Sequence, residues 1–360
     1  MKKSPLTTLC YIEKDDQYLM LHRVKKKNDI NKDKWIGIGG HFEACESPEE
    51  CLLREAKEET GLSLTSWKLR GIVTFVARVR PDAGETEGAI ADLEYMFLYT
   101  ADGFEGEVGG CDEGVLEWVP KRLVTTLPLW DGDRIFLKLL AEDAPFFSLK
   151  LIYEGDRMVY ASLDGRQLEL FDVCGENGEL TGAVTERSVA HTAGLRHRTA
   201  HIWVVRENVC GSFDVLLQRR SADKESFPLC YDVSAAGHVM AGDSCGDSAR
   251  RELQEELGIA AAPEELAYAG VFDTGDIYAE FHGRPFHDHE ISAVYIYRKK
   301  VDADRLQLQA DEVASVHWMD YRTCCQHVKD GDTQFCIHPR DLELLGAYMK
   351  KLGLYTDAAV

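Results

Sequence analysis

The sequence predicts an α+β fold that occurs twice in one chain of 360 residues. The length suggests two domains rather than one. A segment that begins at Gly40, GHFEACESPEECLLREAKEETGL, returns in altered form as GHVMAGDSCGDSARRELQEELGI from Gly237. Each copy lies among strand-like segments with few helical patterns. We therefore expect two domains, residues 1–163 and 164–360, divided in the polar stretch SLDGRQ.

The first repeated segment contains the start and end signals of a helix. Ser47 can accept bonds from the first free amides, Pro48 suits the first helical position, and Glu50 can bond back to the cap. Gly61 suits the left-handed conformation that ends many helices. The segment from Pro48 to about Gly61 is therefore predicted to be helical.

Acidic residues crowd one face of this predicted helix. Glu55, Glu58 and Glu59 are spaced i, i+3 and i+4, so they share a face, and Arg54 can pair with Glu58. Three close carboxylates repel each other unless they share a cation, and oxygen ligands suit Mg²⁺ or Mn²⁺. A solvated acidic face is the alternative for EAKEE alone. The second copy repeats the spacing with Arg251, Glu252, Glu255 and Glu256, which favours the metal site.

Strand patterns surround both copies. In the first half we expect a hairpin over 6–13 and 17–23, strands at 67–80, 92–100 and 115–119, a helix over 128–140, and a closing hairpin over 147–162. In the second half we expect strands in ELFDV, LTGAV and TAHIWVV, at 213–220, 231–239, 265–273, 289–298 and 314–318, and a helix at about 339–352. The run 282–289 is expected to be a solvated loop.

Composition limits the partners and the compartment. The net charge of −21 disfavours a nucleic acid polymer or an anionic membrane surface as partner, although a divalent ion can still bring a nucleotide to the protein. There is no long apolar stretch and no signal-peptide pattern at the N-terminus. Eleven scattered cysteines without a C-x-x-C pair fit reduced thiols in the cytoplasm. A zinc site remains an alternative, although its residues follow no common spacing: Cys324, Cys325, His327, Cys336 and His338. The oligomeric state is not predicted.

The repeated pattern resembles the conserved box of the Nudix hydrolases. It consists of a glycine, five residues, an acidic residue, seven residues and then REAKEETGL or RELQEELGI. The resemblance implies two αβα sandwiches with mixed sheets, which bind small nucleotide or diphosphate substrates and cleave phosphoanhydrides with Mg²⁺ or possibly Mn²⁺. It implies metal binding by Glu55, Glu58, Glu59 and a later acidic residue, for which Glu113 is the best match. A carbonyl of the loop before the box, at Gly39, could also serve the metal.

The first half resembles the MutT-type branch, which hydrolyses oxidised purine nucleoside triphosphates such as 8-oxo-dGTP. The segment LWDGD matches a base-reading stretch, so Trp130 would stack on the purine and Asp133 would bond its edge. Gly132 stands where those enzymes have an aspartate, and Ile36 stands at the position of a base-reading asparagine. Glu58 is our choice for the general base, assisted by Glu55 and Arg54. Trp130 as an ordinary core aromatic, and a different nucleoside diphosphate-linked substrate, remain alternatives.

The second half resembles the branch close to isopentenyl-diphosphate isomerase, through AHTAGLRHR and SAAGHVMAGDS. In the isomerase, residues matching His191, His238 and Glu290 bind metal. Ala236 stands in place of a cysteine that isomerisation requires, while the box is nearly whole, with Asp243 for the usual glutamate. We therefore expect hydrolysis, with Arg251, Glu252 and Glu255 in catalytic roles and Glu256 among the metal ligands. The alternatives are a regulatory module that binds a diphosphate, and surface histidines without a ligand role.

Overall fold

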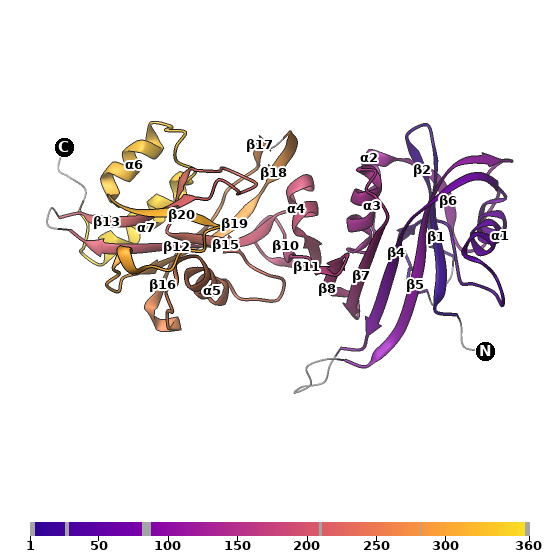
Figure 1. Ribbon diagram of the computed structural model, residues 1–360, viewed down its shortest axis with the longest axis horizontal. Coiled ribbons are helices and arrows are strands. Elements are labelled where there is room, and N and C mark those ends of the chain that lie inside the picture. The colour runs from indigo at the N-terminus through magenta and orange to yellow at the C-terminus, as the bar shows by residue number, and fades with distance from the viewer. Residues whose placement is uncertain (1–3, 26–28, 81–87, 209–210, 282, 357–360) are drawn as a thin grey trace. The chain divides into compact units, whose positions relative to one another are not determined.

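The computed structural model describes residues 4–25, 29–80, 88–208, 211–281 and 283–356 (Figure 1). Contacts within the chain divide it into two compact units. Unit 1 comprises Met1–Leu170 and Ala183–Val189, and unit 2 comprises Phe171–Gly182 and Ala190–Val360. The boundary expected between residues 163 and 164 stays a prediction, because a division by contacts does not define domains that fold independently.

Unit 1 is built on a nine-stranded mixed sheet. Its strands are β1 (Leu6–Lys14), β2 (Gln17–His22), β3 (Trp35–Ile36), β4 (Ser63–Arg78), β5 (Ile90–Glu105), β6 (Val115–Pro120), β7 (Phe147–Glu154), β8 (Arg157–Leu163) and β9 (Arg166–Gln167). The order is β3-β2-β1-β5-β4-β7-β8-β9, and β6 pairs with β2. The pairs β1–β5 and β4–β7 are parallel, which makes the sheet mixed.

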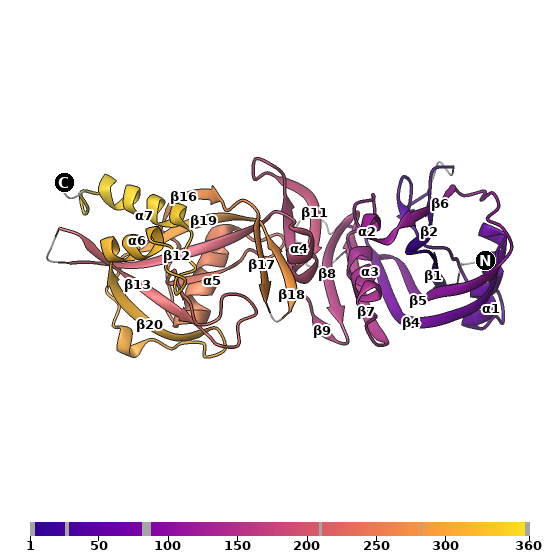
Figure 2. The same ribbon diagram turned by 90° about the horizontal axis from the view of Figure 1, so that it is seen from above.

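Helices cover both faces of this sheet (Figures 1 and 2). On one face, α1 (Pro48–Thr60) buries Leu52 and Ala56 against Cys10 and Ile12 of β1. Successive strand residues point to opposite faces, so Tyr11 faces the other side, where its ring meets Phe136 of α3 (Asp133–Ala141). A short helix, α2 (Lys121–Val124), follows β6. The predicted αβα arrangement is therefore confirmed for unit 1.

Unit 2 has a seven-stranded mixed sheet and two strand pairs outside it. Its strands are β10 (Leu170–Cys174), β11 (Leu180–Glu186), β12 (His197–Glu207), β13 (Phe213–Arg220), β14 (Tyr231–Asp232), β15 (Ala235–His238), β16 (Leu266–Asp273), β17 (Ile277–Phe281), β18 (Arg284–Asp288), β19 (Glu290–Tyr297) and β20 (Val313–Asp320). The order is β14-β13-β12-β19-β16, while β15 pairs with β12 and β20 with β13. The pair β12–β19 is parallel. β10 pairs with β11, and both lie across the division between the units.

The helices of unit 2 also lie on two sides of its sheet. On one side α5 (Cys245–Leu257) packs Leu253 against Ile202 of β12. On the other side α6 (Tyr321–Lys329) and α7 (Pro339–Lys351) pack residues such as Leu345 against Trp203. Three short helical segments complete the chain: α4 (Arg187–Ala193), η1 (Pro263–Glu265) and η2 (Ala303–Arg305). No helix among the described residues combines the length and apolar character needed to cross a membrane.

Two expectations about secondary structure are corrected. The helix expected from Pro128 begins only at Asp133, because the carbonyl of Pro128 already accepts a bond from Trp35 and that of Leu129 from Lys34. The loop expected over 282–289 contains β18, which pairs along its length with β17; His282 lies outside the described residues. Both differences come from bonds to distant segments, which the local pattern does not contain.

Asp133→Asn should change how stability depends on pH. Burial raises the pKa of Asp133 from its ordinary value of 3.8 to about 7. The folded protein then binds this proton more tightly than the unfolded chain, so the wild type loses stability as the pH rises from about 4 to about 7. Asparagine carries no such charge. Between pH 5.5 and 8 the wild type should lose about 2 kcal/mol relative to Asp133→Asn, at about 1.4 kcal/mol per pKa unit.

Scanning calorimetry of the full chain at both pH values measures this difference. Asp102→Asn, at an exposed position of β5, is the matched control and should follow the wild type. Parallel pH profiles for the wild type and Asp133→Asn would show that Asp133 ionises in the folded state without cost.

Candidate functional site

The helix α1 starts and ends as its sequence predicts. The Ser47 side chain accepts a bond from the Glu50 amide, the Glu50 carboxylate accepts one from the Ser47 amide, and Pro48 is the first helical residue. Gly61 ends the helix with φ of 77°. These signals place the box glutamates on a helix of defined register.

The glycine that opens the box allows a carboxylate to lie directly on the backbone. A Cβ at Gly40 would lie 2.6 Å from Oε1 of Glu55, and one at Gly237 would lie 2.2 Å from Oε1 of Glu252. Both distances are far shorter than van der Waals contact. In each unit, therefore, a residue larger than glycine would displace this glutamate carboxylate from its position against the loop.

Burial destabilises the charged form of the carboxylates of Glu55 and Glu59 in unit 1. Glu59 is 8% exposed and accepts a bond from the Gly39 amide at 3.0 Å. Burial, with the nearby charges of Glu113 and Glu55, raises the pKa of Glu59 to about 7. Burial also raises the pKa of Glu55. A cation bound between these groups would offset the desolvation of their charges.

Arg54 organises the neighbouring carboxylates. Its guanidinium donates to Glu46 at 2.6 and 2.9 Å, to Glu55 at 2.7 Å and to Glu58 at 3.1 Å, and also to the carbonyl of His41. The bond from Arg54 holds the pKa of Glu46 down at about 2. The Glu58 side chain remains 59% exposed, so it is accessible to water.

Two further predicted groups lie beside this cluster. Glu113 is ion-paired with Arg23, and its charge acts on both Glu55 and Glu59, so the structure places it close to the box. The carbonyl of Gly40 accepts a bond from the Thr8 amide. Among the described residues, no hydrogen bond uses the carbonyl of Gly39, so this oxygen can still serve a ligand.

The second box repeats the arrangement with deeper burial. Glu256 is 2% exposed and accepts bonds from the Ala236 amide at 3.1 Å and from Gln218 at 3.3 Å. Burial, followed by the charge of Glu252, raises the pKa of Glu256 to about 8. Burial also raises the pKa of Glu252. The Glu255 side chain is 50% exposed, so like Glu58 in unit 1 it is accessible to water.

The arginine of the second box has fewer partners. Arg251 contacts Glu252 at 2.8 Å and Glu255 at 3.0 Å, and it donates to the carbonyl of His238. Within the described part of unit 2, no bond joins Arg251 to Asp243, which occupies the place of Glu46. The aspartate side chain is one methylene shorter, so the first link of the Arg54 network is missing here.

Of the predicted base-reading residues of unit 1, Trp130 and Asp133 lie together, since the Asp133 amide donates to the Trp130 carbonyl at 3.0 Å, whereas Ile36 lies apart. Trp130 is 8% exposed, packs edge-on against Tyr153 and donates from Nε1 to Asn31, while the Lys34 ammonium lies 4.9 Å from its ring centre. Asp133 is 9% exposed at the start of α3. Ile36 instead packs against the core beneath α1. No hydrogen bond within the described segments joins Ile36 to Trp130 or Asp133.

Three histidines and a glutamate converge in unit 2. His191 of α4, His197 of β12, His238 of β15 and Glu290 of β19 each offer a ligand atom, and these atoms lie within 4.8 Å of one another. We call this set the histidine cluster. The Nε2 atoms of His191 and His238 are 3.3 Å apart. The rings of His197 and His238 both stack against Phe171, which fixes their planes.

Asp288 adds a fifth group to this set. Its Oδ1 lies 3.6 Å from Nε2 of His191 and 3.8 Å from Nε2 of His197, and this buried oxygen has no hydrogen-bond partner among the described residues. Burial raises the pKa of Asp288 to about 7. Two bonds of about 2.0–2.1 Å to one tetrahedral ion would place two ligand nitrogens roughly 3.3 Å apart. The spacing and the unpaired buried oxygen therefore fit a bound cation.

Sequence reasoning selected His191, His238 and Glu290 but missed His197 and Asp288. Asp288 precedes Glu290 by two residues, and His197 begins β12 opposite Glu290 in the parallel register. The two-residue spacing between Asp288 and Glu290 could have been read from the sequence. The pairing of β12 with β19 was not, and it brings His197 to the cluster.

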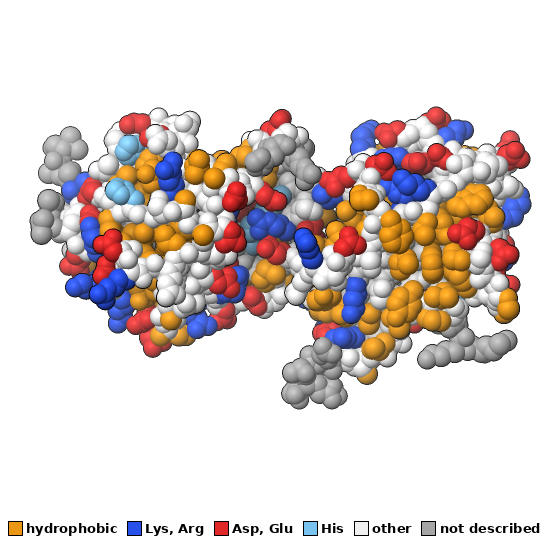
Figure 3. Space-filling view, viewed as in Figure 1, with side chains coloured by type: hydrophobic (Ala, Val, Ile, Leu, Met, Phe, Trp, Pro, Cys, Tyr) orange, Lys and Arg blue, Asp and Glu red, His pale blue; other side chains and the backbone are white. Residues whose placement is uncertain are grey.

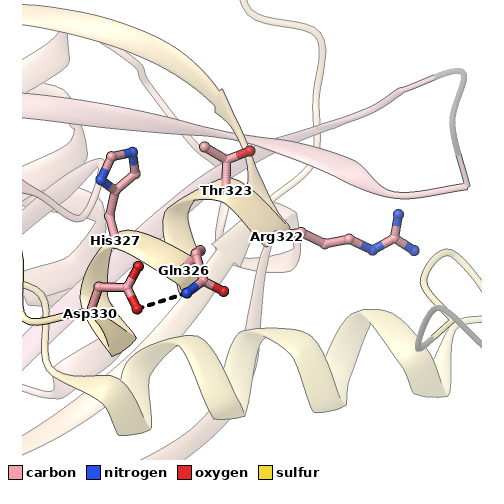
Figure 4. A pocket seen from close by; sticks show the side chains of 5 residues that line it. All are labelled: Arg322, Thr323, Gln326, His327 and Asp330. Atoms are coloured by element: carbon pink, nitrogen blue, oxygen red, sulfur yellow. Dashed lines mark hydrogen bonds between the residues drawn. The ribbon is translucent and has the colours of Figure 1, made fainter. Parts of the chain in front are cut away.

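Other polar groups do not form a comparable site. An open hollow of about 330 Å³ lies along α6, lined by four residues of that helix and by Asp330, which follows its last turn (Figure 4): Arg322, Thr323, Gln326, His327 and Asp330. A second hollow, of about 220 Å³, lies at the start of α5. Neither hollow is lined by a box glutamate or a histidine of the cluster. Within the described residues, the histidine cluster is also the only metal-ligand grouping found, so the alternative zinc set around Cys324 does not assemble.

The surface of unit 1 also carries apolar side chains. In the space-filling view they gather over β4 and β5 (Figure 3), and β5 contributes the exposed Ile90 and Tyr95. Neither residue belongs to the box.

Comparisons with known proteins identify the family of both units. The family model of the NUDIX domain matches residues 3–140 and 195–334. An uncharacterized Nudix hydrolase of Clostridium acetobutylicum is 38% identical over 148 residues, which cover 41% of this chain and 68% of that protein. Nudix hydrolase 3 of Arabidopsis thaliana is 36% identical over 155 residues, which cover 42% of this chain and only 19% of that protein. The crystal structure of a MutT protein from Bacillus halodurans matches at 30% identity with a TM-score of 0.39, covering 44% of this chain and 97% of that chain.

The two matched segments include both boxes and most of the sheet that supports each of them. The family model covers more than half of the chain. With two helices that each carry the clustered glutamates, this protein belongs to the Nudix family as a tandem of two NUDIX domains, and it is a hydrolase that acts on phosphoanhydride bonds.

Proposed function

We propose that unit 1 hydrolyses a nucleoside triphosphate, with oxidised dGTP as the preferred substrate, to the monophosphate and pyrophosphate. The observation that carries this proposal is that Glu55 lies against Gly40 and the buried Glu59 accepts a bond from the Gly39 amide, beside a Gly39 carbonyl that no hydrogen bond among the described residues uses. Hard oxygen donors of this kind suit Mg²⁺ or Mn²⁺.

The side chains of the first box divide the work of hydrolysis. When bound, the divalent ion would neutralise phosphate charge and lower the pKa of a coordinated water. Glu55, Glu59 and Glu113 would hold it, and the exposed Glu58 would accept the proton of the attacking water. Arg54 keeps Glu55 and Glu58 in register, because its guanidinium reaches both at once.

Asp133 supports the choice of an oxidised purine. With a pKa near 7, its carboxyl can either donate or accept a hydrogen bond at neutral pH, which suits a purine edge whose donors and acceptors change on oxidation. Trp130 offers little area for stacking while Lys34 lies over its ring, so the base would displace that ammonium or meet the ring at its edge. A different nucleoside diphosphate-linked substrate remains the second candidate, because Ile36 packs away from these two residues.

For unit 2 we propose hydrolysis of a diphosphate compound, with a second metal centre in the histidine cluster. Imidazole nitrogens with a carboxylate suit a transition ion such as Zn²⁺, unlike the oxygen donors of Glu252, Glu255 and Glu256. Ala236 has no proton to give or take, so isomerisation of a carbon skeleton lacks one of its two catalytic groups. A regulatory module that binds a diphosphate without cleaving it is the alternative.

The first box can be tested with paired substitutions in the full chain. Glu58→Gln and Glu59→Gln should each lower kcat/KM for nucleoside triphosphates at least about 100-fold with saturating Mg²⁺, because the base or a metal ligand is lost while glutamine preserves the helix. Glu255→Gln and Glu256→Gln are the matched controls from unit 2 and should leave this activity in place. Near-normal turnover by either unit 1 variant would refute the assignment of that residue.

The base pocket can be tested by comparing two nucleotides. In a Glu256→Gln background, Asp133→Ala should raise KM for 8-oxo-dGTP about 10- to 100-fold and leave KM for dCTP nearly unchanged. The loss of a hydrogen bond to a buried base edge is worth roughly 1–3 kcal/mol. Equal effects on the two nucleotides would remove the oxidised-purine preference and leave a general nucleotide hydrolase.

The reaction of unit 2 can be tested once unit 1 is silenced by Glu59→Gln. This variant should release phosphate or a nucleotide from at least one compound of a diphosphate panel, and a further Glu256→Gln change should abolish that release. Isopentenyl diphosphate with Mg²⁺ should remain unrearranged by NMR. The appearance of the dimethylallyl isomer would contradict the proposal. If no compound of the panel is hydrolysed, the regulatory module is favoured.

A further inference from the structure

The two carboxylate oxygens of Glu290 have different surroundings. Oε1 lies 3.8 Å from Nε2 of His238 in the histidine cluster. Oε2 accepts a hydrogen bond from the Thr199 hydroxyl at 3.0 Å, and Nε2 of His201 lies 3.9 Å from the same oxygen. Oε2 is therefore bonded by the Thr199 hydroxyl with the His201 ring nearby, while Oε1 faces the cluster.

The His201 ring is positioned by a hydrogen bond on the side away from Glu290. Its Nδ1 donates to Asp341 at 2.6 Å, and the other oxygen of Asp341 accepts from Nε1 of Trp203 at 3.0 Å. Asp341 is fully buried in the first turn of α7, where the helix dipole favours a negative charge. Both oxygens of Asp341 are engaged, so its position fixes the plane of the His201 ring.

Strand register aligns these groups with the cluster. His197, Thr199 and His201 are alternate residues of β12 and share one face of the sheet. In the parallel pairing of β12 with β19, His197 stands opposite Glu290 and Thr199 opposite Ser292. The hydroxyls of Thr199 and Ser292 are 2.9 Å apart, and these residues are 3% and 0% exposed. The contact with Glu290 is thus shielded from water on the Thr199 side.

We propose that Thr199 and the His201–Asp341 pair are positioning residues that hold Oε2 of Glu290, so that Oε1 alone serves as a metal ligand of the histidine cluster. This inference rests on the proposed metal centre of unit 2. We call the three residues the Glu290 bracket. Groups that orient a ligand from behind typically contribute about 10- to 100-fold in metal affinity.

Metal binding to the full chain provides a test that does not depend on turnover. Thr199→Val removes the hydroxyl at nearly constant size, and Thr199→Ser restores it. His201→Asn keeps a donor for Asp341 but removes the atom that faces Glu290. Co²⁺ binding is followed by its visible absorption, which changes when imidazole nitrogens replace water, and affinity is measured by competition with a chelator. All variants carry Glu59→Gln and Glu256→Gln to weaken the two box sites, and circular dichroism confirms that they fold.

We expect Thr199→Val and His201→Asn to bind Co²⁺ about 10- to 100-fold more weakly with an altered spectrum, and Thr199→Ser to stay within about threefold of the parent. His191→Ala is the reference for loss of the centre. If the parent binds Co²⁺ no better than His191→Ala, both the metal centre and the bracket are overturned. If the parent binds tightly and His191→Ala does not, but Thr199→Val and His201→Asn match the parent, only the bracket is overturned.

Discussion

In both units the first of the three clustered glutamates, Glu55 or Glu252, lies against a glycine of the box loop. The carboxylate of Glu55 lies on Gly40 and that of Glu252 lies on Gly237, in positions that a Cβ would force them to leave. This contact brings the box loop next to the helix. The last glutamate then reaches a loop amide, so Glu59 bonds Gly39 and Glu256 bonds Ala236 in the corresponding way. The rest of each candidate site depends on this approach.

The close packing of helix and loop also buries negative charge, and the protein neutralises only part of it. Burial raises the pKa of Glu59 to about 7 and that of Glu256 to about 8, because a desolvated carboxylate is stable only with a partner charge. Arg54 balances the outer carboxylates but does not reach Glu59. A divalent cation is the natural counter-charge for the inner ones.

The two units use the shared frame differently. Arg54 is tied to Glu46 by two bonds, whereas Asp243 makes no bond to Arg251 within the described chain. Unit 2 instead links its box to the histidine cluster through one residue. The carbonyl of His238 accepts from Arg251, while its ring faces His191 and Glu290. A change on one side of His238 can therefore reach both proposed centres, and α7 joins the same network through Asp341.

The sequence by itself determined the repeated box, the caps of α1, and the shared face of the glutamates in α1 and α5, because these depend on spacing within one helix. It also indicated His191, His238 and Glu290 through resemblance. Only the tertiary structure decided that His197 and Asp288 join them, that Ile36 turns away from Asp133, and that α3 begins late. Each of these outcomes depends on pairing between segments far apart in the chain. Strand register and burial are set there by the packing of the whole sheet, which no local pattern of residues contains.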